Sequence, residues 1–249
     1  MSGHSKWASI KHKKAVVDAR RGQQFTKLTR AITVAAREGG GDPDGNPALG
    51  LAIQKAKDAS MPKDNIERAV AKGTGEGVDA DQIQTVLYEG YGPGGVALLI
   101  EAMTDNRNRT GADVRHMLTK HGGNLGEPGS VSYLFDKRGV IVVDAARYGE
   151  DDLMTAIDAG ALDISLDDDV FEVITEPGDL VAVRSALERA GVEIESAALA
   201  ELPKSRVPVE EGDAARLMKL IDALEESDDV SSVHANFDVD SALLERMAS

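Results

Sequence analysis

The spacing of apolar residues predicts that the chain begins with helices. From Phe25 onward, apolar positions recur every three or four residues, which places them on one helical face. The residues on this face are Phe25, Leu28, Ile32 and Ala35. The opposite face carries Lys27, Arg30 and Arg37, and the glycines from Gly39 to Gly41 end the helix. We therefore expect an amphipathic helix with an apolar face for packing and a basic face that stays available.

Two shorter helices are predicted next. Asn46 and Pro47 form an N-cap and first-turn pattern for a helix that reaches about Ala59. Pro62 starts a third helix, which ends at Gly73. The residues expected to point inward from it are Ile66, Ala69 and Val70. Residues 1–76 thus form a helical module, and Gly73 to Asp81 read as a linker.

From Gln82 the pattern changes to short β-rich runs. TVLYEGYG and GVALLIEAM are separated by Pro93, Gly94 and Gly95, which predicts a hairpin. A helix is expected from about Thr110 to Lys120, opened by the capping pattern Thr110-Gly-Ala-Asp113. The run VSYLF, which follows a glycine-rich stretch, is expected to be a strand.

The most regular part lies between residues 138 and 202. GVIVVD, ALDISL, DVFEVIT and VEIESAALAE read as strands, and EDDLMTAIDAGA and GDLVAVRSALERAG read as helices. Their order, β-α-β-β-α-β, is typical of a ferredoxin-like sandwich.

The tail supplies one more helix, DAARLMKLIDALEE, and one strand, SSVHANFDV. A single helix and strand bury too little surface to form a domain alone. We therefore expect residues 203–249 to complete residues 77–137 as one discontinuous domain, with residues 138–202 inserted. The predicted fold is α+β, with an N-terminal three-helix module and two ferredoxin-like mixed α/β domains, one inserted in the other.

Composition narrows the class of protein. Apolar residues make up 42% and aromatic residues 4% of the chain, so we expect cores of Ala, Val, Leu and Ile. The absence of cysteine excludes disulfides, thiolate nucleophiles and Cys-based zinc sites. No run approaches the ~18 apolar residues that span a bilayer. We expect a soluble, cytoplasmic protein without a membrane partner. The alternative for the acid-poor start is an organelle-targeting segment, but it continues directly into the helix pattern.

Charge is distributed unevenly along the chain. The first thirty residues carry eight Lys or Arg and one acid, Asp18, for a charge of +7, although the whole chain carries −15. The remaining 219 residues therefore sum to −22. This asymmetry indicates that one end binds a polyanion, while the acidic remainder limits indiscriminate adhesion.

The basic segment also contains side chains that can stack on bases, namely Trp7, His4, His12 and Phe25. The nucleic-acid contacts predicted in this segment and its helix are His4, Lys6, Trp7, Lys11, His12, Lys13, Lys14, Arg20, Arg21, Lys27 and Arg30. The alternative for the cations is a solvated face that balances the acidic domains. For Trp7 the alternative is a packing anchor.

A second basic cluster lies in TDNRNRTGADVRH. Arg107 and Arg109 stand just before an expected helix start, where backbone N–H groups and the helix dipole favour an anion. We include both arginines among the predicted nucleic-acid contacts. The alternative is that Asp105 and Asp113 neutralise them in ordinary surface pairs.

The other motifs make no case for catalysis or for a cofactor. The stretches GTGEG, YGPGG and HGGNLG match neither a P-loop nor a dinucleotide fingerprint, so we interpret them as turns. The run from Asp42 begins like a calcium loop, but Pro47 stands where Gly is required. His116 and His121 are not part of an HExxH motif, which would bind a metal. Asp167 to Asp169 lie between two expected strands, and we interpret them as a solvated turn. We expect no enzymatic activity, no cofactor, no metal and no small-molecule substrate.

Taken in order, several motifs resemble those of the YebC/PmpR family. They are GHSKWASIKHKK, FTKL, AAREGGGDP, MPKDNIERA, YEGYGPGGVALLIE, TDNRNRT and GGNLGEPGSVSYLF. Ser9 stands where many members have Asn, and Tyr133 where an aromatic, often Trp, is usual. The resemblance covers nearly the whole chain and implies a three-domain α+β protein with a helical N-terminal module.

The resemblance also implies a function without an active site. Family members have been described as sequence-specific transcriptional regulators that bind promoter DNA, and others resemble ribosome-associated factors that assist translation. We expect a monomeric DNA-binding transcriptional regulator. The alternative is a translation factor that binds ribosomal RNA. No helix-turn-helix pattern stands out, so the residues do not indicate how a sequence would be read. A small-molecule sensor built on the ferredoxin-like domain is a third class.

Overall fold

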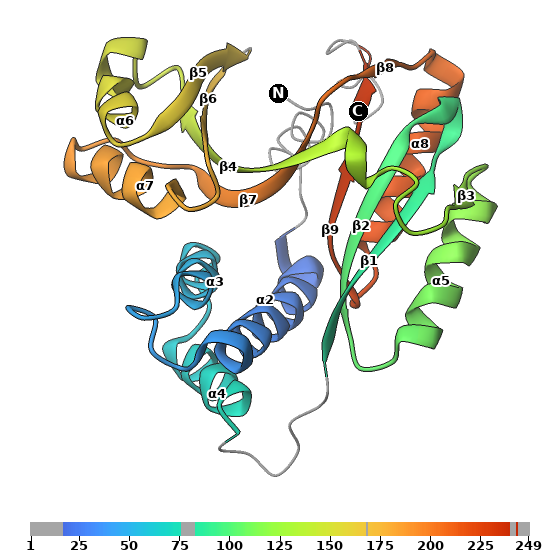
Figure 1. Cartoon of the computed structure of the whole chain (residues 1–249), viewed down its shortest axis with the longest axis horizontal. Coiled ribbons are helices and arrows are strands. Elements are labelled where there is room, and N and C mark those ends of the chain that lie inside the picture. The colour runs from blue at the N-terminus through green and yellow to red at the C-terminus, as the bar shows by residue number, and fades with distance from the viewer. Residues whose placement is uncertain (1–16, 76–82, 168, 240–242, 244–249) are drawn as a thin grey trace. The chain divides into compact units, whose positions relative to one another are not determined.

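The computed structural model describes residues 17–75, 83–167, 169–239 and 243. The described chain forms two compact units, one from Asp136 to Leu202 and one from the residues on either side of it (Figure 1). The two units are described separately. The predicted basic start before residue 17, most of the predicted linker and Asp168 lie outside the described residues.

The first unit in sequence begins with three helices. They are α2 (Val17–Gly39), α3 (Pro47–Asp58) and α4 (Lys63–Gly73). The predicted cap of α3 is confirmed, because the Asn46 side chain accepts a hydrogen bond of 3.1 Å from the amide of Leu49. The buried core of the module consists of Leu28, Ile32, Ala36, Leu49, Ala56, Met61, Ile66 and Ala69. Phe25, Ala35 and Val70 pack against it, as the apolar pattern predicts.

Helices α2 and α4 approach each other closely at Gly73. A Cβ atom at this position would lie 2.7 Å from the Ala36 Cβ and would also clash with the carbonyl oxygen of Thr33. One turn away, the Thr33 hydroxyl lies 3.2 Å from the carbonyl oxygen of Ala69. Gly73 therefore ends α4 and also lets α4 approach α2 closely, because it has no side chain.

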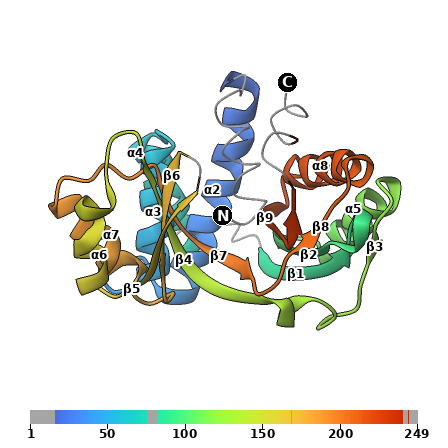
Figure 2. The ribbon, with the colours of Figure 1, turned by 90° about the horizontal axis from the view of Figure 1, so that it is seen from above.

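The same unit contains a four-stranded antiparallel sheet. Its strands are β1 (Gln84–Tyr91), β2 (Ala97–Thr104), β3 (Asn124–Leu125) and β9 (Val230–Ala235), in the order β3-β1-β2-β9. Helices α5 (Arg107–Lys120) and α8 (Glu211–Glu225) pack against one face around Leu98, Ile100 and Phe237 (Figure 2). The tail thus supplies both a helix and a strand to a core that begins near residue 84.

A smaller cluster lies on the other face of this sheet. Alternate residues of a strand point to opposite faces, so Ala97 and Leu99 point away from Leu98 and Ile100. They pack with Val131 and Phe135, and Tyr91 and Leu134 adjoin them. The two short strands β8 (Val207–Pro208) and β10 (Phe237–Asp238) pair in parallel.

The second unit has the β-α-β-β-α-β order expected for residues 138–202. Its strands are β4 (Phe135–Asp144), β5 (Ala161–Asp167), β6 (Val170–Thr175) and β7 (Ser196–Pro203), and its α-helices are α6 (Met154–Asp158) and α7 (Leu180–Arg189). The strand order is β5-β6-β4-β7, which places the first and third strands of the unit at its centre. Short 3-10 turns lie at Pro93–Gly95, Ser132–Leu134 and Glu150–Leu153.

Two local predictions are wrong. Helix α5 begins at Arg107 rather than Thr110, because the Asn106 side chain caps it by accepting a hydrogen bond of 3.1 Å from the amide of Arg109. Thr110 is therefore a buried residue inside the helix. The run VSYLF forms a 3-10 turn up to Leu134, and only Phe135 belongs to a strand. One of the two edge strands of the first sheet is instead β3, within the stretch that the sequence indicated as a glycine-rich turn.

The predicted fold class is confirmed. The first unit begins with a three-helix module, and each of the two units combines a four-stranded sheet with packed helices. Within the described ranges, no helix is both long and apolar enough to cross a membrane.

Candidate nucleic-acid interface and the Asp229 junction

The predicted nucleic-acid contacts fall into three groups in the structure. His4, Lys6, Trp7, Lys11, His12, Lys13 and Lys14 lie outside the described residues. Arg20 and Arg21 belong to the first turns of α2. Lys27, Arg30, Arg107 and Arg109 lie within the part of the chain whose side chains are described.

Lys27 and Arg30 contact the protein itself. The Lys27 ammonium donates a hydrogen bond of 2.5 Å to the carbonyl oxygen of Glu225, at the end of α8. Gln23, one turn earlier, donates to the carbonyl oxygen of Glu226. The basic face of α2 was expected to stay available, but at Lys27 and Arg30 it faces the segment between α8 and β9. This expectation is corrected because unsatisfied carbonyl groups at a helix end attract cations.

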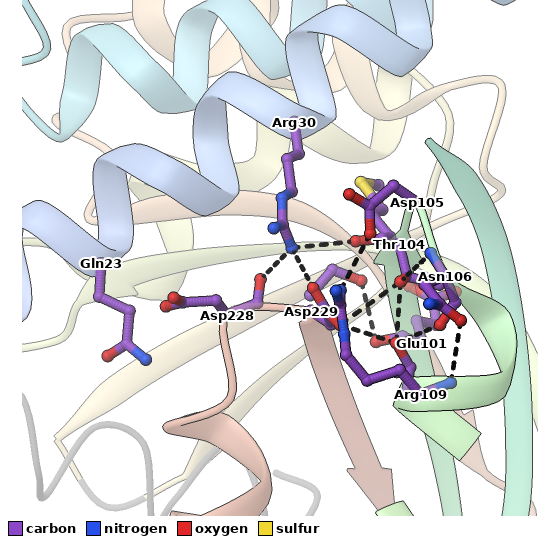
Figure 3. Close-up of polar contacts among 12 residues, drawn as sticks. Gln23, Arg30, Glu101, Thr104, Asp105, Asn106, Arg109, Asp228 and Asp229 are labelled. Carbon is purple, nitrogen blue, oxygen red and sulfur yellow. Dashed lines mark hydrogen bonds and ion pairs between the residues drawn. The ribbon is translucent and has the colours of Figure 1, made fainter. Parts of the chain in front are cut away.

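Arg30 makes the densest set of contacts on this face. Its Nη1 atom lies 2.6 Å from Oδ1 of Asp229, 2.7 Å from the carbonyl oxygen of Asp228 and 3.1 Å from the carbonyl oxygen of Met103 (Figure 3). One guanidinium group therefore joins α2 to the end of β2 and to the start of β9.

Asp229 is the centre of this set of contacts, which we call the Asp229 junction and define as Arg30, Thr104, Arg109, Thr110 and Asp229. Its Oδ2 atom accepts hydrogen bonds of 2.7 Å from the Thr110 hydroxyl and 3.0 Å from Nη2 of Arg109. The Thr104 hydroxyl lies 3.4 Å away. In Figure 3 Arg30 and Arg109 approach the carboxylate from different helices. One carboxylate thus balances two guanidinium groups.

The two arginines of the second cluster differ. Arg109 lies between Asp105, at 2.9 Å, and Asp229, so the arrangement is that of an internal ion pair. The pairing alternative named Asp113, whereas the structure shows Asp229 as the second partner. Arg107 is exposed, and it makes no ion pair with any residue that the structure describes. The role of either arginine in binding nucleic acid stays a prediction.

The environment of Asp229 favours its charged form. Burial by itself raises the pKa of this carboxyl, but hydrogen bonds from Thr110, Arg109 and Arg30 outweigh burial and hold the pKa below its usual range. The residue is 9% exposed. A carboxylate in such a position stabilises the fold only while its partners remain in place.

Glu89 is a second buried carboxylate that the sequence did not point to. It is 6% exposed, and its oxygens accept amide hydrogen bonds from Gly129 at 2.6 Å, Val131 at 2.7 Å and Ser132 at 2.8 Å. Burial raises the pKa of Glu89, but these backbone donors outweigh burial and lower it. A charged residue inside an otherwise β-rich run was the available signal, because a buried carboxylate requires several donors.

Other candidate chemistry finds little support in the described residues. His116 is exposed on α5, whereas His121 follows the helix end, where burial and then Lys120 and Lys219 lower its pKa. Within the described ranges, no three His, Asp or Glu side chains are grouped so that they could hold a metal ion. Phe25, one of the predicted stacking side chains, packs against the helical core.

Comparison with known proteins places these features in a family. The model described as TACO1/YebC protein N-terminal domain matches residues 5–76, and the model described as TACO1/YebC second and third domain matches residues 83–237. A relative from Rubrobacter xylanophilus is 55% identical over 249 residues and covers 100% of both chains. One from Salinispora arenicola is 57% identical over 248 residues, with 99% of this chain and 100% of the relative covered. Both are named "Probable transcriptional regulatory protein".

A solved structure agrees with these relatives. The crystal structure of a conserved hypothetical protein, Aq1575, from Aquifex aeolicus matches with a TM-score of 0.84 and 51% identity. The match covers 92% of this chain and 95% of that chain. With both family models matched and relatives more than 50% identical along their whole length, the chain belongs to the TACO1/YebC family.

Proposed function

We propose that this protein is a non-enzymatic regulator of transcription that binds DNA through its basic N-terminal segment. The observation that carries the proposal is the charge of +7 on the first thirty residues of a chain whose total is −15. The names of the relatives support a regulatory role in transcription.

Lysine and arginine on this segment would neutralise phosphates and release condensed counterions, which drives association with DNA. The residues that carry this role are Lys6, Lys11, Lys13, Lys14, Arg20 and Arg21. Trp7, His4 and His12 would add stacking contacts. Arg107 supplies a second contact, because it is exposed at the first turn of α5.

The structure suggests a smaller role for Lys27, Arg30 and Arg109. Each already donates a hydrogen bond to a carbonyl or carboxylate oxygen of the same unit. A phosphate would have to compete with an internal partner for each of these cations. We therefore assign the Asp229 junction to positioning α2, and the earlier cations to contact with the polyanion.

The second candidate function is a translation factor that binds ribosomal RNA. The observation that favours it is the interleaving of Trp7, His4 and His12 with lysines. RNA loops and bulges expose unpaired bases for stacking, which duplex DNA does not. The same basic segment would then contact irregular RNA.

A charge-reversal series tests the role of the segment. The triple variant Lys11→Glu, Lys13→Glu and Lys14→Glu should weaken binding and reduce the slope of log K against log salt by about 2 to 3, since each phosphate contact contributes about 0.7 to 0.9. The matched control is Lys120→Glu, Lys137→Glu and Lys219→Glu, which makes the same charge change at exposed positions elsewhere. Equal slopes for the two triples and the unmodified protein would remove the segment from the proposal.

A second experiment separates DNA from ribosomal RNA. The protein is sedimented with ribosomes from cell lysate, and its bound nucleic acid is crosslinked and sequenced. Enriched promoter DNA without ribosome association supports the transcriptional function. Dominant crosslinks to ribosomal RNA would overturn it in favour of translation.

A further inference from the structure

Tyr133 is displayed on the surface although its neighbours are buried. Its residue exposure of 65% is the largest among the big apolar side chains of the described chain. Val131 is fully buried and Phe135 is 5% exposed, and both pack in the cluster beneath β2. Single exposed apolar residues are common on protein surfaces, so exposure alone does not indicate a site.

The backbone that carries Tyr133 is held firmly. The three amide groups that donate to the buried Glu89 carboxylate belong to the four residues just before Tyr133. The Tyr91 hydroxyl also donates a hydrogen bond of 3.0 Å to the carbonyl oxygen of Ser130. Charge-assisted hydrogen bonds are among the stronger contacts in proteins, so this segment is already ordered. An aromatic ring carried on an ordered backbone costs less conformational entropy to bind than one on a mobile segment.

Cations adjoin this segment. Lys204 donates through Nζ to the carbonyl oxygen of Tyr133 at 3.0 Å, and its amide donates to the carbonyl oxygen of Leu134 at 2.9 Å. Arg206 is exposed two residues further along.

Residues 203–208 form a short basic stretch that follows an acidic part of the chain. Residues 203–208 contain two cations and no acid, whereas residues 139–202 carry sixteen Asp or Glu against three Lys or Arg. The nearest acids in sequence to Tyr133 are Asp136, which pairs with Arg138 at 3.8 Å, and the exposed Glu127. Lys204 therefore lies at the backbone of Tyr133, and Arg206 follows it in a short stretch without acids.

We propose that Tyr133 is a stacking platform for an unpaired base of a single-stranded nucleic acid, with Lys204 holding the platform's backbone and the exposed Arg206 as the cation for the phosphates of that strand. An aromatic ring on an ordered backbone, with a cation near it in the chain, is the combination that single-strand-binding surfaces use. The proposal rests on the second candidate function, the binding of RNA with unpaired bases, because it adds a contact on the α+β domain for that polyanion. It also names the substrate class as strands with unpaired bases.

Fluorescence anisotropy with a labelled 20-nucleotide single-stranded RNA, and with its duplex, tests the platform. Tyr133→Ala should raise Kd for the single strand about 5-fold or more, because base stacking contributes about 1 to 3 kcal/mol per base. It should leave the salt slope and the affinity for the duplex unchanged, because no charge is removed. Leu166→Ala is the matched control, since Leu166 is 60% exposed on β5. Equal affinities of Tyr133→Ala and the control for the single strand would overturn the proposal, as would an equal loss on the duplex.

A spectroscopic readout does not depend on affinity. Trp7 is the single tryptophan of the chain, so Trp7→Phe with Tyr133→Trp places one reporter at the platform. Saturating single-stranded RNA should quench this reporter, whereas a reporter at the control position, Trp7→Phe with Leu166→Trp, should keep its emission. An unquenched Tyr133→Trp reporter overturns the platform.

The two proposals fail separately. If the lysine triple weakens binding while both Tyr133 tests are negative, only the platform is overturned. If the lysine triple binds normally while Tyr133→Ala weakens binding, the N-terminal segment is overturned as the main contact. Thermal unfolding of Tyr133→Ala should match that of the unmodified protein, because the ring is mostly exposed.

Discussion

At the scale of single residues, the Asp229 carboxylate joins charged side chains from two helices of the first unit. Two guanidinium groups from different helices and a buried threonine hydroxyl converge on one carboxylate. Neither arginine is next to Asp229 in the sequence. Asp229 therefore holds α2 and α5 at the start of β9, through Arg30 and Arg109.

Asp229→Asn should destabilise the protein by about 2 kcal/mol, because removal of the charge leaves Arg30 without its counterion and Arg109 with Asp105 alone. For a chain of this length the melting temperature should fall by roughly 4 to 8 °C at pH 7. Circular dichroism against temperature measures the change. An unchanged melting temperature would show that the junction does not stabilise the fold.

The same substitution makes a prediction about pH. The pKa of Asp229 is lower in the folded protein than its ordinary value of 3.8. The charged form therefore stabilises the fold above about pH 4, and this contribution is lost as pH falls below that value. The stability difference between the unmodified protein and Asp229→Asn should thus be full at pH 7 and smaller at pH 3. A difference that grows toward pH 3 would contradict this assignment.

At the scale of elements, the close contact between α2 and α4 depends on the absence of a side chain at Gly73. Gly73→Ala should destabilise the helical module by about 1 to 3 kcal/mol, because the new methyl group meets Thr33 and Ala36. Gly22→Ala is the control, since Gly22 lies in α2 with open space around it and should gain about 0.5 to 1 kcal/mol. Thermal unfolding of both variants checks the opposite signs.

Elements with a strong local pattern could be predicted from the sequence. Asn46-Pro47 gave the start of α3, and alternating apolar runs gave the hairpin of β1 and β2. The start of α5 was missed because Asn106 and Thr110 both resemble caps, and only the tertiary partner Asp229 places Thr110 inside the helix. The run VSYLF has a strand composition, but its first two residues, Val131 and Ser132, donate to the Glu89 carboxylate together with Gly129, and these bonds turn the chain there.

The candidate site could be predicted only in part. Local charge identified the basic segment and the two arginines at α5, because clustered cations are visible in the sequence. Asp229, the carboxylate that pairs with both Arg30 and Arg109, is 199 and 120 residues away from them along the chain, so no local pattern reveals it. Tyr133 could be found only by its exposure, since aromatic residues in the sequence more often indicate a core.

At the scale of the whole molecule, Arg30 links α2 to residues 228 and 229, near the other end of the described chain. Arg30→Gln should increase amide hydrogen exchange in residues 17–39 and 225–235 together, because both sides of the link lose the same group. The control is Arg68→Gln in α4, because the hydrogen-bond acceptors of Arg68, Asp64 and Asn65, lie on its own helix. Faster exchange in only one of these two segments would contradict the conclusion that Arg30 stabilises both.

The position of β9 in the first sheet has a consequence for synthesis. The protein is synthesised from its N-terminus. One edge of β2 therefore stays unpaired until β9, which begins at Val230, has been synthesised. Until then the growing chain exposes the unpaired backbone of β2, which is a template for pairing with other chains. The strands of the inserted unit are complete by Pro203, so that unit can close first, within a domain that is still open. A chain that stops twenty residues early would therefore lose the partner of a central strand as well as a tail.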